Sequence, residues 1–522
     1  MEELSETLQR SADYVKTWGR EGLPNGQTLS EAFTFDDLPL WDIVSPEIAL
    51  WLVPRALSRG EQSCSLLQRL RPYLSRAKQS ALSLTVRKPD ERAPIRWQAE
   101  SICLILGFSP YMYRDVLAPV VECLEKRQTR TVSLYDQEPL SNKRGQEVHS
   151  IWEYNTSELT HDIRNQHREL RKWSKRWLAN DMLPRIIRDR ARPLWPQIGD
   201  LFQAFFWVRL PGLIAQASIA RRVLEIYHPT LLISVDVADS RSRLYTLLGK
   251  KYGIPSLEVQ FGLAGPEGIE WQFFDACHLA VRSQRWYDAL LRHGVPAGKM
   301  TVTGSPVYDD RGGETDGAII RSGTRDLGVP PAHRLALFAS FWSHTTVEKW
   351  ANSGRLDRAK RLVFEAASRV RGLTLVVKPH PRENVARTRA LAGDFRNIVF
   401  VSAEEDIRNL IPVCDVFVSF GSTTIQSALI AHKPVIYPYF EGLLWWSDDD
   451  MFLKSGAVYN PRSVQELEHV LNSVVDGSIL ASQKTLEPAR KQFLQDWIHS
   501  DDGQAANRIA ILAGQMALPS RS

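Results

Sequence analysis

The sequence predicts an α/β protein with two doubly wound domains, and three observations lead to this class. Short apolar runs rich in β-branched residues alternate with helical patterns, which is typical of parallel strands buried on both faces. The alternation occurs twice, on either side of a polar, Gly-rich segment at 311–317. The length of 522 residues exceeds one ordinary core. We therefore expect two successive domains with a small-molecule site in the cleft between them.

The expected domain boundaries follow from this alternation. Residues 1–95 are expected to form a mostly helical extension, 96–312 the first doubly wound domain, 313–485 the second, and 486–522 two C-terminal helices. Helical, basic material is expected to fill 145–225. Strands are predicted at 101–106, 131–135, 230–235, 256–260, 278–281 and 300–303 in the first domain, and at 335–339, 373–377, 398–401, 416–420 and 434–437 in the second.

Composition excludes several classes of protein. A formal net charge of +5 is too small to indicate a general nucleic-acid binder. The five cysteines are scattered without CxxC spacing, so we expect reduced thiols and no zinc site. The N-terminus lacks the apolar stretch of a signal peptide, and the longest apolar stretch, 202–220, contains Arg209 and Pro211. We therefore expect a cytoplasmic protein without a spanning helix.

The charge excess is concentrated between Arg164 and Arg192, where ten Lys or Arg residues stand against three acidic ones. Tryptophans are interleaved with these charges. One explanation is a solvated helix face. The other is peripheral contact with an anionic membrane surface through 164–195, which would place the protein on the inner face of the cytoplasmic membrane.

Two polar clusters follow predicted strands of the second domain and predict a ligand pocket. Lys378, His380 and Pro381 come after the strand at 373–377, and Ser422–Thr424 come after the strand at 416–420 and open a helix. Ligands of open α/β sheets bind outside the carboxyl ends of the strands, and the first turn of a helix attracts phosphate. Ser340 follows another predicted strand and is expected to line the same phosphate site. The alternative is a capped helix beside a histidine that only bonds backbone.

Candidates for the chemical step lie in the first domain. Asp236 and Asp239 follow the strand at 230–235, and we expect Asp236 first and Asp239 second to act as base or nucleophile. An Asx turn or helix N-cap is the alternative for both. Arg241 and Arg243 follow, and either one is suited to the carboxylate of a bound ligand, unless they pair with the neighbouring aspartates.

Other polar clusters carry weaker signals. Glu267 and Glu270, in a Gly/Pro-rich loop, are alternative bases, and His344 is expected to line the same phosphate site or cap a helix. The run Asp448–Asp450 resembles a metal-binding DxD site but is expected to cap the following helix. We therefore expect no metal.

With these residues in view, the chain resembles the GT-B glycosyltransferases and their epimerase relatives. The segment 294–309 is similar to the end of their N-terminal domain. The segments 378–381 and 419–424 resemble the HP and Ser/Thr motifs of bacterial capsule-type transferases, which include polysialyltransferases, Kdo transferases and CDP-glycerol glycerophosphotransferases. The resemblance implies that His380 and Pro381 contact a cytidine monophosphate group and that Ser422 and Thr423 hold its phosphate.

Two departures from these families guide the choice among them. UDP-GlcNAc 2-epimerases place acidic residues where Gln426 and Ser427 stand here, which disfavours an epimerase. Teichoic-acid-type enzymes carry a His before a Gly in the N-terminal domain as base, whereas Phe261 stands at the corresponding place and cannot accept a proton. A carboxylate elsewhere must then do this work.

These observations together predict a bacterial surface-polysaccharide glycosyltransferase that acts on a glycan or lipid-linked acceptor. The expected co-substrate is a CMP-activated acidic sugar such as Kdo, with no other cofactor, and Arg241 or Arg243 is expected to hold the carboxylate of this sugar. The acceptor is expected near Phe108 and Ser109. Alternatives are a CDP-glycerol-type polyol-phosphate transferase, an enzyme like UDP-GlcNAc 2-epimerase, and a noncatalytic glycan- or nucleotide-binding partner.

Overall fold

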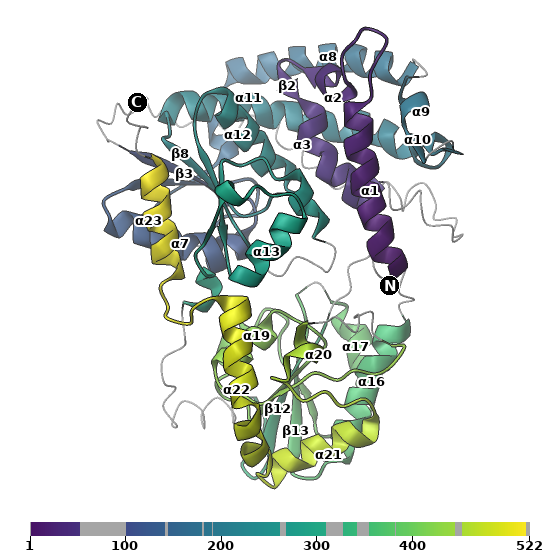
Figure 1. The fold of residues 1–522 in the computed structure, drawn as a ribbon, viewed down its shortest axis with the longest axis vertical. Helices are drawn as coiled ribbons and strands as arrows, with labels where there is room; N and C mark the ends of the chain where they lie inside the picture. The colour runs from purple at the N-terminus through teal and green to yellow at the C-terminus, as the bar shows by residue number, and fades with distance from the viewer. Residues whose placement is uncertain are drawn as a thin grey trace. The chain divides into compact units, whose positions relative to one another are not determined.

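The computed structural model describes residues 2–52, 101–140, 145–179, 182–189, 192–261, 268–309, 327–341, 354–381, 383–443 and 451–517. Its contacts divide the chain into two compact units. The N-terminal unit comprises Glu2–Arg282, Trp286–Val307 and Gln504–Ser522, and the C-terminal unit comprises Met1, Ser283–Arg285 and Tyr308–Gly503. Figure 1 shows a β-sheet at the centre of each unit.

The N-terminal unit contains a seven-stranded sheet in the order β11-β10-β9-β8-β3-β4-β5. Every neighbouring pair in it is parallel. The strands are β3 (Ile102–Leu106), β4 (Arg130–Tyr135), β5 (Glu147–Ser150), β8 (Leu231–Ser234), β9 (Ser256–Val259), β10 (His278–Val281) and β11 (Met300–Val302).

Side chains of the central strands alternate between two hydrophobic cores, because successive residues of a strand point to opposite faces of a sheet. In β3, Ile102, Leu104 and Leu106 join one core, whereas Cys103 and Ile105 join the other. The first core is covered by α1 (Glu2–Arg20), α3 (Leu40–Glu47), α8 (Ser157–Ala179), α11 (Leu210–Tyr227) and α12 (Ser240–Lys251), and the second by α7 (Ala118–Lys126) and α23 (Ala505–Ala517).

The described part of the N-terminal extension, residues 2–52, contributes to the first core, and the rest of the expected extension lies outside the described residues. The Phe33 ring contacts the rings of Trp173, Trp177 and Phe206 at centroid distances of 4.9, 5.0 and 5.6 Å. The two tryptophans of the basic segment therefore pack inward, while the exposed face of α8 carries the charges.

One stretch of the described residues, Trp195–Tyr227, is long and apolar enough to cross a membrane by length and composition. It consists of α10 (Trp195–Ala204), a π-helical turn η4 (Phe205–Arg209) and α11. Of its most apolar window, 61% is buried inside the protein. Pro211 stands in the first turn of α11, directly after the π-helical turn. Packing in the first core accounts for the apolar character of this stretch.

The C-terminal unit contains a five-stranded parallel sheet in the order β14-β13-β12-β15-β16. Its strands are β12 (Arg334–Ala339), β13 (Leu373–Lys378), β14 (Ile398–Phe400), β15 (Val416–Ser419) and β16 (Val435–Ile436). Its helices include α16 (Gly354–Arg369), α17 (Val385–Ala392), α19 (Thr424–Ile430), α20 (Met451–Ser455), α21 (Val464–Val475) and α22 (Ile479–Ile498). The predicted α/β class with two parallel sheets is confirmed.

Two local expectations are wrong. The segment 145–225 is not purely helical, because β5 adds an edge strand to the sheet. Three of the four β5 residues are only half-buried, so the strand lacks the apolar run that marked the others. The two expected C-terminal helices are present as α22 and α23, but α22 begins at Ile479 instead of near 486, and Pro488 lies inside it.

Candidate active site

One polar cluster lies at the carboxyl edge of the N-terminal sheet, where β8, β3 and β4 are neighbours. Phe108 follows β3, Asp136 follows β4, and Asp236 and Asp239 follow β8. Because the strands are parallel, their carboxyl ends meet at one edge, which is where α/β proteins bind ligands. The sequence reasoning identified the two aspartates after β8 but missed Asp136.

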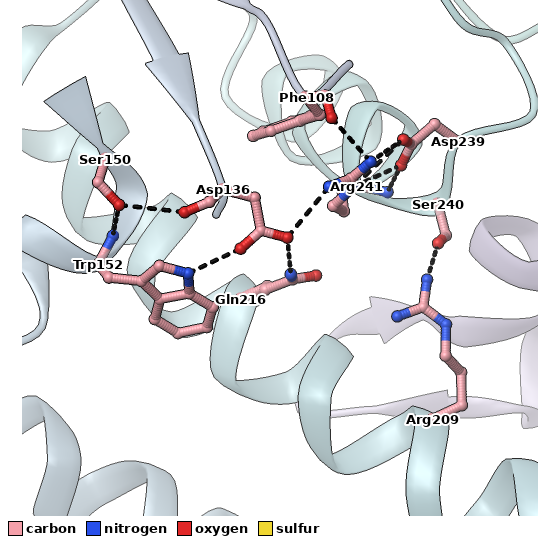
Figure 2. A network of polar contacts seen from close by, with 9 residues as sticks. All are labelled: Phe108, Asp136, Ser150, Trp152, Arg209, Gln216, Asp239, Ser240 and Arg241. Atoms are coloured by element: carbon pink, nitrogen blue, oxygen red, sulfur yellow. Dashed lines mark hydrogen bonds and ion pairs between the residues drawn. The ribbon is translucent and has the colours of Figure 1, made fainter. Parts of the chain in front are cut away.

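Arg241 ties the ends of these three strands together (Figure 2). Its Nη1 donates to Asp136 Oδ2 at 3.0 Å, and its Nη2 donates to the Phe108 carbonyl at 3.1 Å and to Asp239 Oδ2 at 2.6 Å. The guanidinium carbon also lies 5.1 Å from the centroid of the Phe108 ring, in cation–π range. Of the two possibilities that the sequence left open for Arg241, the structure shows the ion pair with aspartates. A contact with a sugar carboxylate stays a prediction.

Asp136 is held from several directions and 9% of it is exposed. Trp152 Nε1 donates to its Oδ1 at 2.7 Å, and Gln216 Nε2 donates to its Oδ2 at 3.5 Å. Together with Arg241, these donors satisfy both carboxylate oxygens. Asp136 therefore serves as a fixed anchor of the cluster.

The environment of Asp239 keeps its carboxylate ionised and occupied. As the N-cap of α12, it accepts a hydrogen bond from the Arg241 backbone N–H at 2.8 Å. Burial alone would raise the pKa of Asp239, but the charge and hydrogen bonds of Arg241 hold the pKa below its ordinary value. A carboxylate so engaged is a poor proton acceptor.

Asp236 differs from Asp239 although only three residues separate them. Its Oδ1 accepts a hydrogen bond from the Ala238 N–H at 3.0 Å, which makes an Asx turn. Burial, and then repulsion from the Asp239 carboxylate, raise the pKa of Asp236 to about 6. A carboxylate with a pKa near neutrality is suited to general-base work. The structure thus distinguishes the two aspartates that the sequence could only rank.

Arg243 has a structural environment. It is 4% exposed, and its guanidinium donates to the carbonyls of Asp42, Val237 and Phe273 and to the Asp275 carboxylate. These acceptors use its donor groups within the N-terminal unit. We therefore do not retain Arg243 in the candidate site.

Glu258, which the sequence reasoning missed, lies beside this cluster in β9. It is 3% exposed and pairs in register with Ser234, whose hydroxyl donates to its carboxyl group. Burial, and next to it the Asp236 charge, raise the pKa of Glu258 to about 8, so this group stays protonated at neutral pH. The available signal was a single acidic residue inside an apolar strand.

A second polar cluster lies at the carboxyl edge of the C-terminal sheet. Ser340 follows β12, the segment 378–381 includes and follows the end of β13, and Ser422 follows β15. Since β12 lies between β13 and β15, the fold brings the three predicted segments to one edge. Their placement matches the sequence-based pocket, and their ligand roles stay predictions.

Lys378 differs in burial from His380 and Pro381, which follow it after β13. Lys378 is 7% exposed, and its Nζ donates to the carbonyls of Pro379 at 2.9 Å and Ala403 at 2.8 Å. Burial lowers its pKa. Lys378 therefore fastens the loops after β13 and β14, while His380 and Pro381 are exposed.

Gly421 lies in the loop after β15, and its φ of 104° requires glycine. Ser422 Oγ accepts from the Thr424 N–H at 3.3 Å and from the Thr424 hydroxyl at 2.8 Å, and Thr423 is exposed. Gln426 is fully buried in α19, where its Oε1 accepts a hydrogen bond from the Tyr308 hydroxyl at 2.5 Å. It therefore belongs to the packing of the C-terminal unit.

Several weaker candidates lie outside the described residues: Glu267, His344 and Asp448–Asp450. Glu270 lies in a 3₁₀ turn, Ile269–Phe273. Across the described part of the chain, no group of three or more His, Cys, Asp or Glu side chains is arranged to hold a metal ion.

A protein-family model described as CDP-Glycerol:Poly(glycerophosphate) glycerophosphotransferase matches residues 284–512. This match includes both predicted donor loops. Together with the two parallel sheets, it supports a transferase enzyme of the GT-B class. No curated protein matches the chain.

Solved structures similar to this chain include both epimerases and a polymerase. UDP-GlcNAc 2-epimerase from Neisseria meningitidis bound to UDP-GlcNAc is 14% identical, with a TM-score of 0.49 over 80% of this chain and 100% of that one. The wall teichoic acid polymerase TagF is 12% identical, with a TM-score of 0.47 over 87% and 97%. UDP-GlcNAc 2-epimerase from Methanocaldococcus jannaschii is 13% identical, with a TM-score of 0.48 over 80% and 99%.

Proposed function

We propose that this protein transfers a polyol phosphate, such as glycerol phosphate, from a CDP-linked donor to a hydroxyl group of a bacterial surface polymer. The observation that carries the proposal is the glycerophosphotransferase match over 284–512. It favours the polyol-phosphate alternative of the sequence analysis over transfer of Kdo from CMP-Kdo. Both alternatives keep a cytidine nucleotide as the donor group.

In the proposed reaction, an acceptor hydroxyl oxygen attacks the phosphorus next to the glycerol. A new phosphodiester bond forms, the bond from that phosphorus to CMP breaks, and CMP leaves with the electron pair. Catalysis of such a displacement consists mainly of positioning and of stabilising charge. The proton of the acceptor hydroxyl goes to a base.

The proposed donor group lies at the carboxyl edge of the C-terminal sheet. His380 and Pro381 would contact the cytidine monophosphate part, and the Ser422 and Thr423 hydroxyls would donate to its phosphate. The exposure of His380, Pro381 and Thr423 leaves them accessible to a ligand. No further cofactor is proposed.

Asp236 is the proposed base. Phe261, which stands where related enzymes have a histidine, packs edge-on against the Tyr111 ring at 5.5 Å and has no proton-accepting atom. The pKa of about 6 leaves most Asp236 ionised at pH 7 while keeping its affinity for a proton high for a carboxylate. The acceptor would approach the same strand ends, near Ser109.

Product analysis tests this function. The protein is incubated with a glycerol-phosphate polymer acceptor and, in separate reactions, with CDP-glycerol, CMP-Kdo or UDP-GlcNAc, and the nucleotide products are separated by chromatography. The proposal predicts CMP and a lengthened acceptor from CDP-glycerol alone. Release of CMP with Kdo transfer, or epimerisation of UDP-GlcNAc, would replace it with one of the alternatives.

Contact with an anionic membrane surface is also proposed, because lipid-linked polymers are held there. Only charge supports it, since the interleaved tryptophans pack inward. Co-sedimentation with vesicles tests the idea: binding to phosphatidylglycerol but not phosphatidylcholine vesicles is expected, and equal binding to both contradicts it. The basic side chains exposed on α8 are Arg164, Arg168, Arg171, Lys172, Lys175 and Arg176.

A further inference from the structure

Glu383 closes the turn that carries His380. Its Oε2 accepts a hydrogen bond from the His380 backbone N–H at 2.9 Å. The Glu383 backbone N–H donates in return to the His380 carbonyl, also at 2.9 Å. Both backbone polar groups of His380 are thus held by one residue, and this residue lies three positions further along the chain.

The other carboxylate oxygen of Glu383 binds the body of the C-terminal unit. Its Oε1 accepts from Ser340 Oγ at 2.8 Å, from Lys360 Nζ at 2.5 Å and from Thr388 Oγ1 at 2.5 Å. These donors come from the end of β12, from α16 and from α17. One carboxylate therefore links the His380 turn to three separate elements.

The Lys360 and Glu383 side chains are each only 4% exposed. A buried ion pair is a poor source of net stability, because removing both charges from water offsets their attraction. It specifies geometry well, because each donor must stand in one direction to be satisfied. The Glu383 carboxylate of this pair hydrogen-bonds to the His380 backbone and to the Ser340 hydroxyl, and the sequence assigns both residues to the donor site.

We propose that Glu383 is the positioning residue of the donor site. Its carboxylate, neutralised by Lys360, holds the His380–Pro381 turn and the Ser340 hydroxyl in the arrangement that receives the cytidine nucleotide. This inference rests on the proposed function, since it needs a nucleotide at that edge of the sheet. A site whose loops are already fixed loses less conformational entropy when a ligand binds. Removal of the Glu383 contacts should therefore weaken nucleotide binding more than it slows the chemical step.

The test compares Glu383→Gln with Asp357→Asn. Asp357 accepts a hydrogen bond from Arg387 Nε at 2.7 Å, and this pair also joins α16 to α17. Among the described residues, neither Asp357 nor Arg387 hydrogen-bonds to His380 or Glu383. Calorimetry with CDP and steady-state kinetics with CDP-glycerol are measured for both variants. We expect Glu383→Gln to raise the CDP Kd and the donor KM about tenfold while kcat changes less than about threefold. Asp357→Asn should leave all three at their wild-type values.

Thr388→Val keeps the ion pair and removes only one hydroxyl, so it serves if Glu383→Gln does not fold. Its CDP Kd should rise about threefold. Wild-type CDP affinity in either folded variant, or an equal loss in Asp357→Asn, would overturn the role of Glu383 and leave the proposed function standing. Absence of CDP binding by the wild-type protein would overturn both.

Discussion

The two strand-end clusters occupy the same place in their sheets but treat charge in opposite ways. In the N-terminal unit, Arg241 pairs with Asp136 and Asp239, while burial and then repulsion from the Asp239 carboxylate raise the pKa of Asp236. In the C-terminal unit, Lys378 and Glu383 are turned inward, and the groups at the surface are an imidazole and hydroxyls. The first arrangement suits proton transfer, and the second suits holding an anionic nucleotide.

The largest expected effect comes from removing the proton acceptor of the first cluster. Asp236→Asn keeps the side-chain size and the Asx turn but cannot accept the acceptor's proton. We expect kcat for CDP-glycerol to fall about 100-fold to 10,000-fold with an unchanged CDP Kd. Steady-state kinetics and calorimetry check this. Asp239→Asn shows which aspartate is the base. A larger loss of kcat in Asp239→Asn than in Asp236→Asn would make Asp239 the base instead.

The next effect tests whether Arg241 stabilises the first cluster by pairing with Asp136 and Asp239. Arg241→Met leaves the Asp136 and Asp239 carboxylates without their shared cation. Breaking one side of a partly buried pair is expected to cost about 3 kcal/mol. The N-terminal transition in thermal unfolding should move down by about 5 °C or more. Arg10→Met, which removes a pair to Asp189 from an arginine that is 50% exposed, should change little. Similar decreases in the unfolding temperature of both variants would contradict this role of Arg241.

A smaller, tenfold effect is expected in the second cluster. His380→Ala should raise the CDP Kd and donor KM about tenfold and leave kcat within about threefold, because this residue is proposed to bind and not to react. Titration of the variant with CDP and UDP provides the measurement. A variant that binds CDP as the wild type does would remove His380 from the donor site.

The smallest effect is a dependence of stability on pH that originates in Glu258. Its pKa is about 8 in the folded protein and 4.5 ordinarily, so between these values the folded state holds a proton that the unfolded chain releases. Stability from this group is therefore complete below about pH 4.5 and is lost as the pH rises to 8. Melting temperatures of wild type and Glu258→Gln are compared at pH 5 and pH 8. The variant should gain about 5 °C relative to wild type over this interval, whereas a constant difference would mean that Glu258 is ionised in the folded state.

The strands of both sheets could be predicted from the sequence because buried parallel strands are short runs of apolar, β-branched residues. The run at 373–377 became β13, which extends only one residue further. β5 escaped prediction because an edge strand with half-buried residues has no such run. Topology then placed the polar segments at two sheet edges, as expected for parallel strands.

The direction of each charged side chain could not be predicted in the same way. Lys378, Arg241 and Arg243 stand in segments that suggested ligand contacts, yet each one finds carbonyl or carboxylate partners inside its own unit. Glu383 gave no signal because its partners Ser340 and Lys360 are distant in sequence. A single sequence gives the charges but not the tertiary partners that satisfy them.

The central claim is that the N-terminal cluster transfers the proton and the C-terminal cluster binds the nucleotide. The most direct test is the release of CMP from CDP-glycerol by wild type, Asp236→Asn and His380→Ala under the same conditions, with kcat and KM determined separately. We predict that the wild type releases CMP, that Asp236→Asn loses kcat at an unchanged KM, and that His380→Ala gains KM at a nearly unchanged kcat. No CMP release by the wild type, or the reverse pattern in the two variants, would contradict the account.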